Sequence, residues 1–292
     1  MRILIVSGSR ADLGLLHCPE KVLREDGNVV YLALMPPEAV TNFAAAFILA
    51  GNFFKETEPD ILLILGDRWE IMAAATCAHL LRVPIAHIGG GDVTEGSYDD
   101  AMRDCISRMA NIHFATSFAS AARLVTCGYR NVHLVGNPAV DYIMHEAWQR
   151  EREIAEPYVL VSYQPETIEK EFGAGQEIGR IFASLPNDKR RVFVRPNPDH
   201  GSVLVNDIIN GYEQTRDIIF DGTSHDRFLN LLYHCDEFIG NSSAAYYEAP
   251  FLKPGGVKCR VIGKRQRGRV VPWSGDGKAS ERIRDVLRLW PA

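Results

Sequence analysis

Acidic side chains follow two neighbouring apolar runs in this sequence. Residues 61–65 and 83–88 are short, continuous apolar runs that indicate buried parallel strands. The carboxyl ends of parallel strands meet at one edge of a sheet and face the ligand crevice, so acids that follow these strands are expected at one cleft edge. A single acid after a strand is typical of a helix cap, whereas several after neighbouring strands favour acid–base catalysis. The acids concerned are Asp67, Asp92, Asp99 and Asp100.

A second candidate site follows a strand predicted at 237–239. The run from Gly240 to Ser243 opens a helix directly after this strand. Free amides at a helix start, together with the hydroxyls of Ser242 and Ser243, are suited to binding a phosphate, although capping by Asn241 or Ser242 is the alternative. Further along the same helix, Glu248 is a candidate acceptor for two ribose hydroxyls, or a plain helix glutamate.

Positive charge for such an anion has to be local, because the formal net charge of the chain is −5. Arg10 follows the first predicted strand, Arg195 ends a strand at 191–194, and a basic run from Lys264 to Arg269 follows a strand at 257–262. For that basic run, diphosphate binding and a solvated loop are both open. Two histidines are candidates for proton transfer: His200, and His87, which its apolar strand favours as a core residue.

An alternation of strands and helices must position these residues. The first half shows strands at 2–7, 28–34, 60–66, 83–88, 112–115 and 132–135, and the second half at 158–163, 191–194, 218–220, 237–239 and 257–262. Repeated β-α-β units imply parallel sheets with right-handed crossovers. A polar helix is predicted over 139–154, and the charged segment from Glu151 to Pro157 is the candidate boundary between two domains. We therefore predict an α/β protein of two doubly wound domains, 1–155 and 156–292, facing each other across a cleft.

Composition excludes several classes of protein. At 46% hydrophobic and 24% charged residues, the chain is an ordinary globular one, and its net acidity gives no general attraction to nucleic acid or anionic membrane. Six cysteines without a C-x-x-C pair suit reduced thiols in the cytoplasm rather than disulfides or zinc. No P-loop, G-x-S-x-G elbow, signal peptide or membrane span is recognisable. We expect a soluble cytoplasmic protein with no metal.

In chain order the motifs are G-S-R-A-D, G-D-R-W-E, A-H-I-G-G-G-D-V-T-E-G-S-Y-D-D-A-M-R, V-G-N-P, R-P-N-P-D, G-N-S-S-A-A-Y-Y-E-A-P and I-G-K-R-Q-R-G-R. Together they resemble the UDP-N-acetylglucosamine 2-epimerase family, and more closely its hydrolysing branch, which serves sialic-acid and related nonulosonic-acid synthesis. The resemblance implies the GT-B fold, two Rossmann-like domains with a nucleotide sugar between them. It also implies no cofactor and a homo-oligomer, either a dimer or a tetramer.

By this resemblance the enzyme removes the C2 proton of the sugar, eliminates UDP to leave 2-acetamidoglucal, and adds water to give free N-acetylmannosamine. Asp67 and Asp99 resemble the acid/base residues, with Asp92 and Asp100 close by. Arg10 and Arg195 resemble diphosphate contacts, and Glu248 the ribose-binding acid. The full set of implied substrate contacts is Arg10, Arg103, Asn137, Gln164, Arg195, Asn197, His200, Gly240, Asn241, Ser242, Ser243, Glu248, Arg265 and Arg269.

The chain also departs from the family pattern. Gly89 stands where members often carry Glu or His, and Asp104 and Gln164 stand where His is usual. Ala244 and Ala245 replace glycines, and the region 26–58 is shorter than its family counterpart.

Several alternatives stay open at this point. The same chemistry could act on UDP-N,N'-diacetylbacillosamine, or a non-hydrolysing epimerase could return the sugar with UDP still attached. A GT-B glycosyltransferase is another alternative. It would need an acceptor, so release of UDP from the donor alone would argue against it. An inactive nucleotide-sugar binder is the last alternative, and multiple turnover of a nucleotide sugar would exclude it.

Overall fold

The computed structural model describes residues 1–8, 10–35, 42–95, 97–146, 148, 150–166, 178–197, 201–212, 215–265 and 276–291. By their internal contacts the residues form two compact units. The first comprises Met1–Asp92, Asp99–Glu146 and Pro272–Ala292, and the second comprises Val93–Tyr98 and Ala147–Val271.

A six-stranded parallel sheet is the centre of the first unit, with the order β2-β1-β3-β4-β5-β6. Its strands are β1 (Arg2–Ser7), β2 (Val29–Leu34), β3 (Ile61–Leu65), β4 (Ile85–Ile88), β5 (Ile112–Ala115) and β6 (Val132–Leu134). The chain adds β2 on one side of β1 and then crosses to add β3 on the other. The order of the strands thus reverses between β1 and β3, and such a switch point is where open α/β sheets bind ligands.

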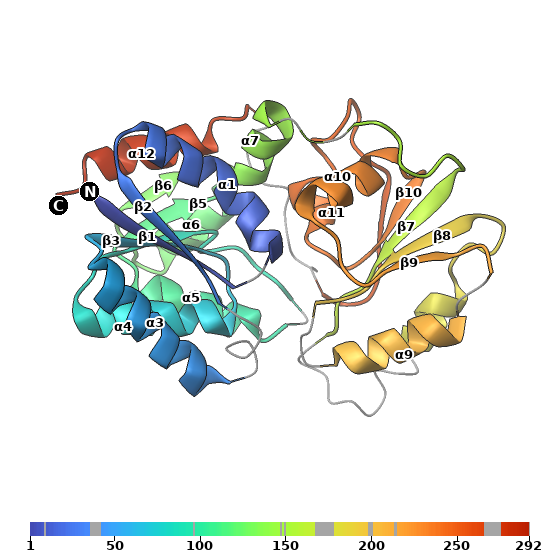
Figure 1. Cartoon of the computed structure of the whole chain (residues 1–292), viewed down its shortest axis with the longest axis horizontal. Coiled ribbons are helices and arrows are strands. Elements are labelled where there is room, and N and C mark those ends of the chain that lie inside the picture. The colour runs from blue at the N-terminus through green and yellow to red at the C-terminus, as the bar shows by residue number, and fades with distance from the viewer. Residues whose placement is uncertain are drawn as a thin grey trace. The chain divides into compact units, whose positions relative to one another are not determined.

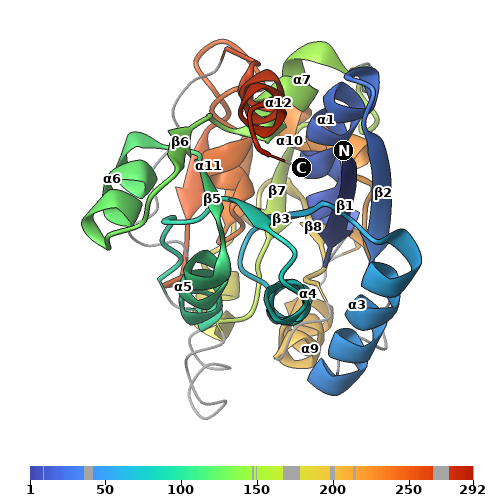
Figure 2. The same ribbon diagram turned by 90° about the vertical axis from the view of Figure 1, so that its left-hand side faces the viewer.

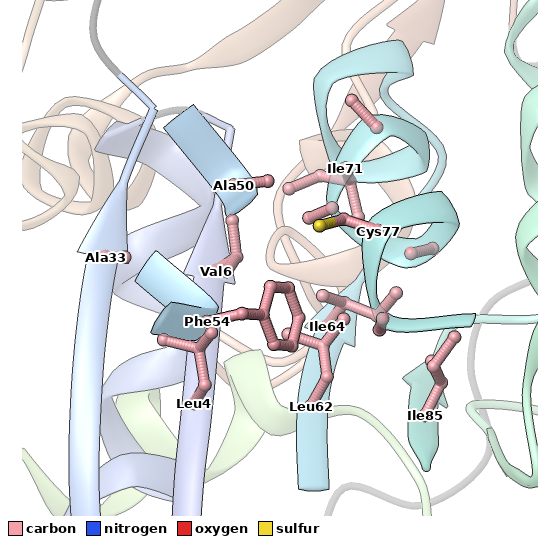
Figure 3. Packing of buried hydrophobic residues seen from close by; sticks show 14 of the residues in the cluster. Leu4, Val6, Ala33, Ala50, Phe54, Leu62, Ile64, Ile71, Cys77 and Ile85 are labelled. Atoms are coloured by element: carbon pink, nitrogen blue, oxygen red, sulfur yellow. The ribbon is translucent and has the colours of Figure 1, made fainter. Parts of the chain in front are cut away.

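Helices cover both faces of this sheet (Figures 1 and 2). One face carries α1 (Arg10–Glu25), α7 (Pro138–His145) and α12 (Ala279–Arg288), and the other carries α3 (Phe43–Thr57), α4 (Trp69–Leu81) and α5 (Asp99–Met109). The remaining helix of this unit, α6 (Phe118–Thr126), contacts β5 and β6 at the edge of the sheet. Figure 3 shows the buried Phe54 ring of α3 beside Leu4 and Ile64 of the sheet. Full burial of such a side chain stabilises the fold by about 1.5–3 kcal/mol. The strands that end at the candidate acids therefore stand in a rigid core.

Side chains supplied by the local sequence fix where several helices begin. Asn42 accepts hydrogen bonds from the amides of Ala44 and Ala45 at the start of α3. Ser117 forms a capping box with Ser120 at the start of α6. Such caps satisfy amides that have no partner inside the helix, and each stabilises it by about 1 kcal/mol.

The second unit has a five-stranded parallel sheet with the order β11-β10-β7-β8-β9. Its elements are β7 (Tyr158–Ser162), β8 (Arg190–Val194), α9 (Ser202–Tyr212), β9 (Ile218–Phe220), α10 (His225–His234), β10 (Glu237–Gly240), α11 (Ala244–Tyr247) and β11 (Cys259–Val261). Within this unit, α9 lies on one side of the sheet and α10 with α11 on the other (Figure 1). The switch point here falls between β7 and β10.

The predicted α/β fold with two doubly wound, Rossmann-like units is confirmed, and it is of the GT-B class. Three helices differ from prediction. The helix predicted over 139–154 ends at His145, because Glu146 is extended and its carboxylate binds Lys21 of α1 at 2.8 Å. α11 ends at Tyr247, so Glu248, which was predicted to lie on this helix, is its C-cap; Pro250 disfavours helical backbone before it. α9 was not predicted, although Val205 and Ile209 form a buried helical stripe.

The C-terminal segment differs from the predicted second domain of 156–292, because α12 packs on the first unit. Its Ile283 and Leu287 lie in the cluster that holds Leu16 and Leu23 of α1. The carboxylate of Asp141 in α7 caps α12 by accepting hydrogen bonds from the amides of residues 279 and 280 at 3.1 and 2.6 Å. The first unit is therefore built from both ends of this sequence.

Two further features bear on the class of protein. None of the helices in the described part of the chain combines the length and apolar character that crossing a membrane requires. All six cysteines are free thiols.

Candidate functional site

The predicted acids lie where two central strands of the first unit end and where α5 begins. Asp67 follows β3, and Asp92 ends the glycine turn after β4. Asp99 and Asp100 are the first two residues of α5, a position that suits acids because of the positive end of the helix dipole. Because β3 borders the switch point, these carboxylates stand at the ligand-binding edge of the sheet.

Arg103 of α5 links three of these acidic positions. One terminal nitrogen, Nη2, donates to Oδ2 of Asp67. The other, Nη1, donates to Oδ1 of Asp100 and, at 2.8 Å, to the backbone carbonyl of Asp92. The Arg103 side chain is only 2% exposed. The planar guanidinium thus holds β3, the turn after β4 and α5 in one arrangement. Contact of Arg103 with substrate stays a prediction.

Thr116, which the sequence analysis missed, orients the carboxylate of Asp92. Its hydroxyl donates to the two carboxylate oxygens of Asp92 at 3.0 and 3.2 Å. A second arginine, Arg123, donates to the Asp92 carbonyl at 3.2 Å. The available signal was a threonine directly after the apolar strand β5, at the same sheet edge as the acids.

His87 of β4 holds the backbone just before Asp67. Its Nε2 lies 2.7 Å from the carbonyl oxygen of Gly66, and its Nδ1 lies 3.1 Å from the Ser107 hydroxyl. Burial lowers the pKa of His87 to about 4, so the ring is neutral at pH 7. Nε2–H therefore donates to Gly66, and Nδ1 accepts from Ser107. The prediction that His87 is a satisfied core residue is confirmed.

A fully buried carboxylate, Glu70 of α4, lies next to Gly8, directly after β1. Its Oε1 accepts from Nε of Arg68, and its side chain is 0% exposed. A Cβ at Gly8 would lie 2.7 Å from that oxygen, so a larger residue there would have to displace the Glu70 side chain. Gly8 therefore packs tightly against the start of α4. Arg10 is the first residue of α1, and its side chain falls outside the described part; diphosphate contact by Arg10 stays a prediction.

In the second unit, polar side chains join the ends of three strands. The Gln164 amide donates to Oδ1 of Asn241 at 2.6 Å, and Nδ2 of Asn241 donates back to the Gln164 carbonyl at 2.8 Å. The side-chain oxygen of Gln164 accepts from the Asn197 amide at 3.1 Å. Gln164, which stands where the family usually has histidine, thus acts in this structure as a tether between backbones. Gly240 has no room for a Cβ because the Ser162 carbonyl occupies that place.

The predicted phosphate turn follows β10. The hydroxyl of Ser242 accepts from the Ala244 amide at 3.3 Å. Among the described residues, the amides of Ser242 and Ser243 find no acceptor. Because α11 is a single turn, its dipole is small, and any phosphate bound here would depend on these amides and hydroxyls.

Glu248 ends this turn and carries a buried, unsatisfied oxygen. Its side chain is 10% exposed, and Oε1 lies 3.8 Å from Nε2 of His225. Oε2 has no hydrogen-bond partner among the described residues. A buried carboxylate oxygen without a partner is unfavourable by about 1–3 kcal/mol, so a ligand hydroxyl would relieve the cost.

Arg195 lies at the end of β8, as predicted, but its donors are engaged. Nε donates to Asp221 at 2.9 Å, Nη1 to the side chain of Asn206 at 3.2 Å, and Nη2 to that of Asn210 at 2.7 Å. The two asparagines belong to α9, the helix that was not predicted. Arg195 therefore anchors α9 to β8, and diphosphate contact stays a prediction.

The remaining predicted residues have separate places. Asn137 caps α7 by accepting from the Ala139 amide, and Nη1 of Arg265 donates to the Pro165 carbonyl at 2.9 Å. Asp104 is exposed and pairs with Arg123. Gly89 has a φ of +81°, which L side chains rarely adopt. His200 and Arg269 lie outside the described residues.

Comparison with known proteins identifies close similarity to one family. The profile of the UDP-N-acetylglucosamine 2-epimerase family matches residues 40–276. A Campylobacter jejuni protein named GDP/UDP-N,N'-diacetylbacillosamine 2-epimerase (hydrolyzing) is 29% identical over 78% of this chain and 62% of its own length. A Neisseria meningitidis UDP-N-acetylglucosamine 2-epimerase is 28% identical over 92% of this chain and 81% of its own length. The chain thus spans about three fifths of the first of these relatives.

A solved structure shares the fold. The UDP-GlcNAc 2-epimerase of Neisseria meningitidis, bound to UDP-GlcNAc, aligns with 99% of this chain and 92% of its own at a TM-score of 0.74 and 16% identity. At that identity the likeness concerns the fold, which is the same arrangement of two parallel sheets with alternating helices.

Proposed function

The chain belongs to the UDP-N-acetylglucosamine 2-epimerase family, and from this premise we propose that it is a hydrolysing UDP-N-acetylglucosamine 2-epimerase. The reaction would convert UDP-N-acetylglucosamine and water to N-acetylmannosamine and UDP. The observation that carries the proposal is the set of acids gathered by Arg103 at the switch-point edge of the first unit. Breaking a weakly acidic C–H bond requires such a base, and a second acid for the returning proton.

In the proposed reaction, a carboxylate removes the proton from C2 of the sugar. The C–H electron pair becomes the C1=C2 double bond of 2-acetamidoglucal, and the C1–O bond breaks so that UDP leaves with its electron pair. Water then adds its oxygen to C1 and gives up one proton to a carboxylate, while a carboxylic acid returns a proton to C2 from the opposite face. Asp67 and Asp99 would carry these proton transfers, with Asp92 and Asp100 beside them. Arg103 would hold Asp67 in place throughout.

The nucleotide half would bind to the second unit. The amides and hydroxyls of Ser242 and Ser243 would receive a phosphate, and the unpartnered Oε2 of Glu248 would accept a ribose hydroxyl. Arg265, held against Pro165, would add positive charge. Cations and oriented amides of this kind stabilise the charge that develops on a departing diphosphate.

A second candidate substrate is UDP-N,N'-diacetylbacillosamine. The observation that favours it is the 29% identity with the Campylobacter jejuni protein named for that sugar. The reaction would be the same, because the two sugars share the C2 acetamido group at which the proton is removed.

Proton NMR of UDP-N-acetylglucosamine with the purified protein in deuterated water tests the proposal. Free N-acetylmannosamine with deuterium at C2, together with UDP, is the expected result. Deuterated UDP-N-acetylmannosamine with UDP still attached would identify a non-hydrolysing epimerase. An unchanged sugar would exclude the first substrate, and a repeat with UDP-N,N'-diacetylbacillosamine would then separate the second substrate from an inactive binder.

A further inference from the structure

Glu166, which no part of the proposed mechanism uses, fixes the start of the basic run in the second unit. Its Oε1 accepts a hydrogen bond from the backbone amide of Lys264 at 2.5 Å, across 98 residues of sequence. The same oxygen accepts from the hydroxyl of Tyr163 at 3.1 Å. Beside this contact, Nη1 of Arg265 donates to the carbonyl of Pro165 at 2.9 Å. The segment 163–166 after β7 thus binds the segment 263–265 after β11.

Gly263 is shaped for this contact. Its φ is +73°, in the left-handed region, and a Cβ there would overlap Oε1 of Glu166 and approach the Tyr163 hydroxyl to 3.1 Å. Both the backbone conformation and the close approach of the carboxylate therefore require glycine. A substituent at this position would displace the carboxylate from the Lys264 amide.

The contact is anchored in the core of the unit. Tyr163 is 2% exposed and packs edge-on against Phe182, with ring centroids 6.2 Å apart. Its hydroxyl therefore presents a fixed donor to Glu166. The carboxylate transmits that fixed position to the backbone of Lys264, so the first two cations of the basic run start from a rigid point.

We propose that Glu166 is a positioning residue that sets the affinity of the second unit for a nucleoside diphosphate, by fixing the backbone that carries Lys264 and Arg265. This rests on the proposed function, which places the diphosphate at this unit. Cations held in place before binding avoid the free-energy cost of ordering their side chains when the ligand binds. A carboxylate near a bound diphosphate would repel it, so the value of Glu166 lies in its hydrogen bonds and not in its charge.

Two substitutions of Glu166 separate the effect of its charge from the effect of its hydrogen bonds. In Glu166→Gln the amide oxygen can still accept from the Lys264 amide and the Tyr163 hydroxyl, while the negative charge is gone. In Glu166→Ala both hydrogen bonds are lost. Glu156→Ala is the matched control, because Glu156 is 61% exposed and pairs with Arg190 at 3.5 Å, away from the basic run in sequence.

The experiment measures UDP affinity by isothermal titration calorimetry and hydrogen exchange of the peptide that covers 263–265. We expect Glu166→Ala to weaken UDP binding at least tenfold and to accelerate exchange of the Lys264 amide. Glu166→Gln and Glu156→Ala should keep the UDP Kd within about threefold of the unaltered protein. In turnover, Glu166→Ala should raise KM with kcat changed less than about threefold, because the residue does not touch the reacting atoms.

Two results would overturn the inference: an unchanged UDP Kd in Glu166→Ala, or equal weakening in Glu166→Gln and Glu166→Ala. The latter would assign the effect to charge. If the unaltered protein binds UDP but yields no epimerised sugar, the proposed function fails while the role of Glu166 is still decided by the Kd series. If it does not bind UDP at all, both are wrong.

Discussion

At the scale of single residues, the guanidinium of Arg103 determines where the predicted acids stand. Asp67, Asp92 and Asp100 lie on different segments, and Arg103 hydrogen-bonds to all three of these residues. Burying the arginine makes the arrangement rigid and also costly to disturb, since an acid that loses its buried partner keeps a charge without compensation. Arg103 therefore contributes to the stability of the first unit as well as to the placement of the candidate acids.

Replacing Arg103 should cost stability in proportion to its burial. We expect Arg103→Ala to lower the free energy of unfolding by about 3–5 kcal/mol, the range for breaking a buried ion pair on one side. Arg24→Ala is the control, because Arg24 is 49% exposed and its pair with Glu20 should contribute no more than about 1 kcal/mol. Urea unfolding measures both. Equal losses in the two variants would contradict the organising role of Arg103.

Asp67→Asn separates chemistry from nucleotide binding. If Asp67 handles a proton at the sugar, turnover should fall at least about a thousandfold, in line with the loss of a general acid–base group. The UDP Kd should stay within a few fold, since the nucleotide is proposed to bind the second unit. Asp104→Asn, at the exposed surface, should retain activity within about twofold. A folded Asp67→Asn protein that no longer binds UDP would remove Asp67 from the sugar end.

The types and strand-end positions of the candidate residues were predictable from the sequence, but their partners were not. Asp67 and Arg103 are 36 residues apart, and no local pattern relates an acid after one strand to an arginine inside a later helix. The same holds for Arg195, whose partners Asn206 and Asn210 sit on a helix that the sequence analysis did not identify. Side-chain pairing depends on tertiary packing, which periodicity does not encode.

At the scale of elements, the close approach of the β7 and β10 backbones limits which residues can stand at the ends of these two strands. Gly240 packs its Cα against the Ser162 carbonyl, and the Asn241 and Gln164 pair ties the two strands just beyond. The phosphate turn of Ser242 and Ser243 therefore starts from a fixed point. The Ser224 side chain caps the start of α10 locally, whereas the helix predicted over 139–154 ends at His145, where Glu146 makes a long-range contact with Lys21.

Two glycine substitutions should act in opposite directions. Gly240→Ala would force a Cβ into the Ser162 carbonyl, so we expect a loss of several kcal/mol, comparable with overpacking of a core (about 1–3 kcal/mol or more). Gly211→Ala, in α9 with open space around it, should stabilise by about 0.5–1 kcal/mol, because alanine favours helix. Denaturant midpoints measure both. A harmless Gly240→Ala would mean that the two strands can separate at no cost.

At the scale of the whole molecule, buried histidines make the stability of the first unit depend on pH. His87 and His113 are paired residues on the adjacent strands β4 and β5. Burial lowers the pKa of each from 6.5 to about 4. The unfolded chain therefore takes up protons below about pH 6.5 that the folded chain refuses until about pH 4. The contribution of these two neutral histidines to stability is therefore fully present above about pH 6.5 and is lost as the pH falls from 6.5 to about 4.

We expect the free energy of unfolding to fall by up to about 3 kcal/mol per histidine between pH 6.5 and pH 4. Urea unfolding at 25 °C across that range measures it, and His113→Phe, which keeps an aromatic ring, should lower the slope. Asp26 and Asp60 have pKa values lowered by their hydrogen bonds with Arg288 and Arg2, so they titrate below the window. Burial raises the pKa of Asp141, so protonation of Asp141 stabilises the fold as the pH falls, opposite to the effect of the histidines. This effect is the same in the unaltered protein and in His113→Phe, so it cancels when their pH profiles are compared. Parallel profiles would contradict the assignment to His113.

The return of α12 to the first unit has a consequence for how the protein is made. Synthesis runs from the N-terminus, so the second unit, Val93–Tyr98 and Ala147–Val271, is complete before Ile283 and Leu287 are made and can pack against Leu16 and Leu23 of α1. Domains generally fold as units as they leave the ribosome, which here reverses the usual order and lets the later-made unit finish first. A chain interrupted near residue 271 would display the bare face of α1 to chaperones and proteases. The apolar face of α1, which is synthesised early, would therefore mark a chain that lacks α12 for recognition by quality control.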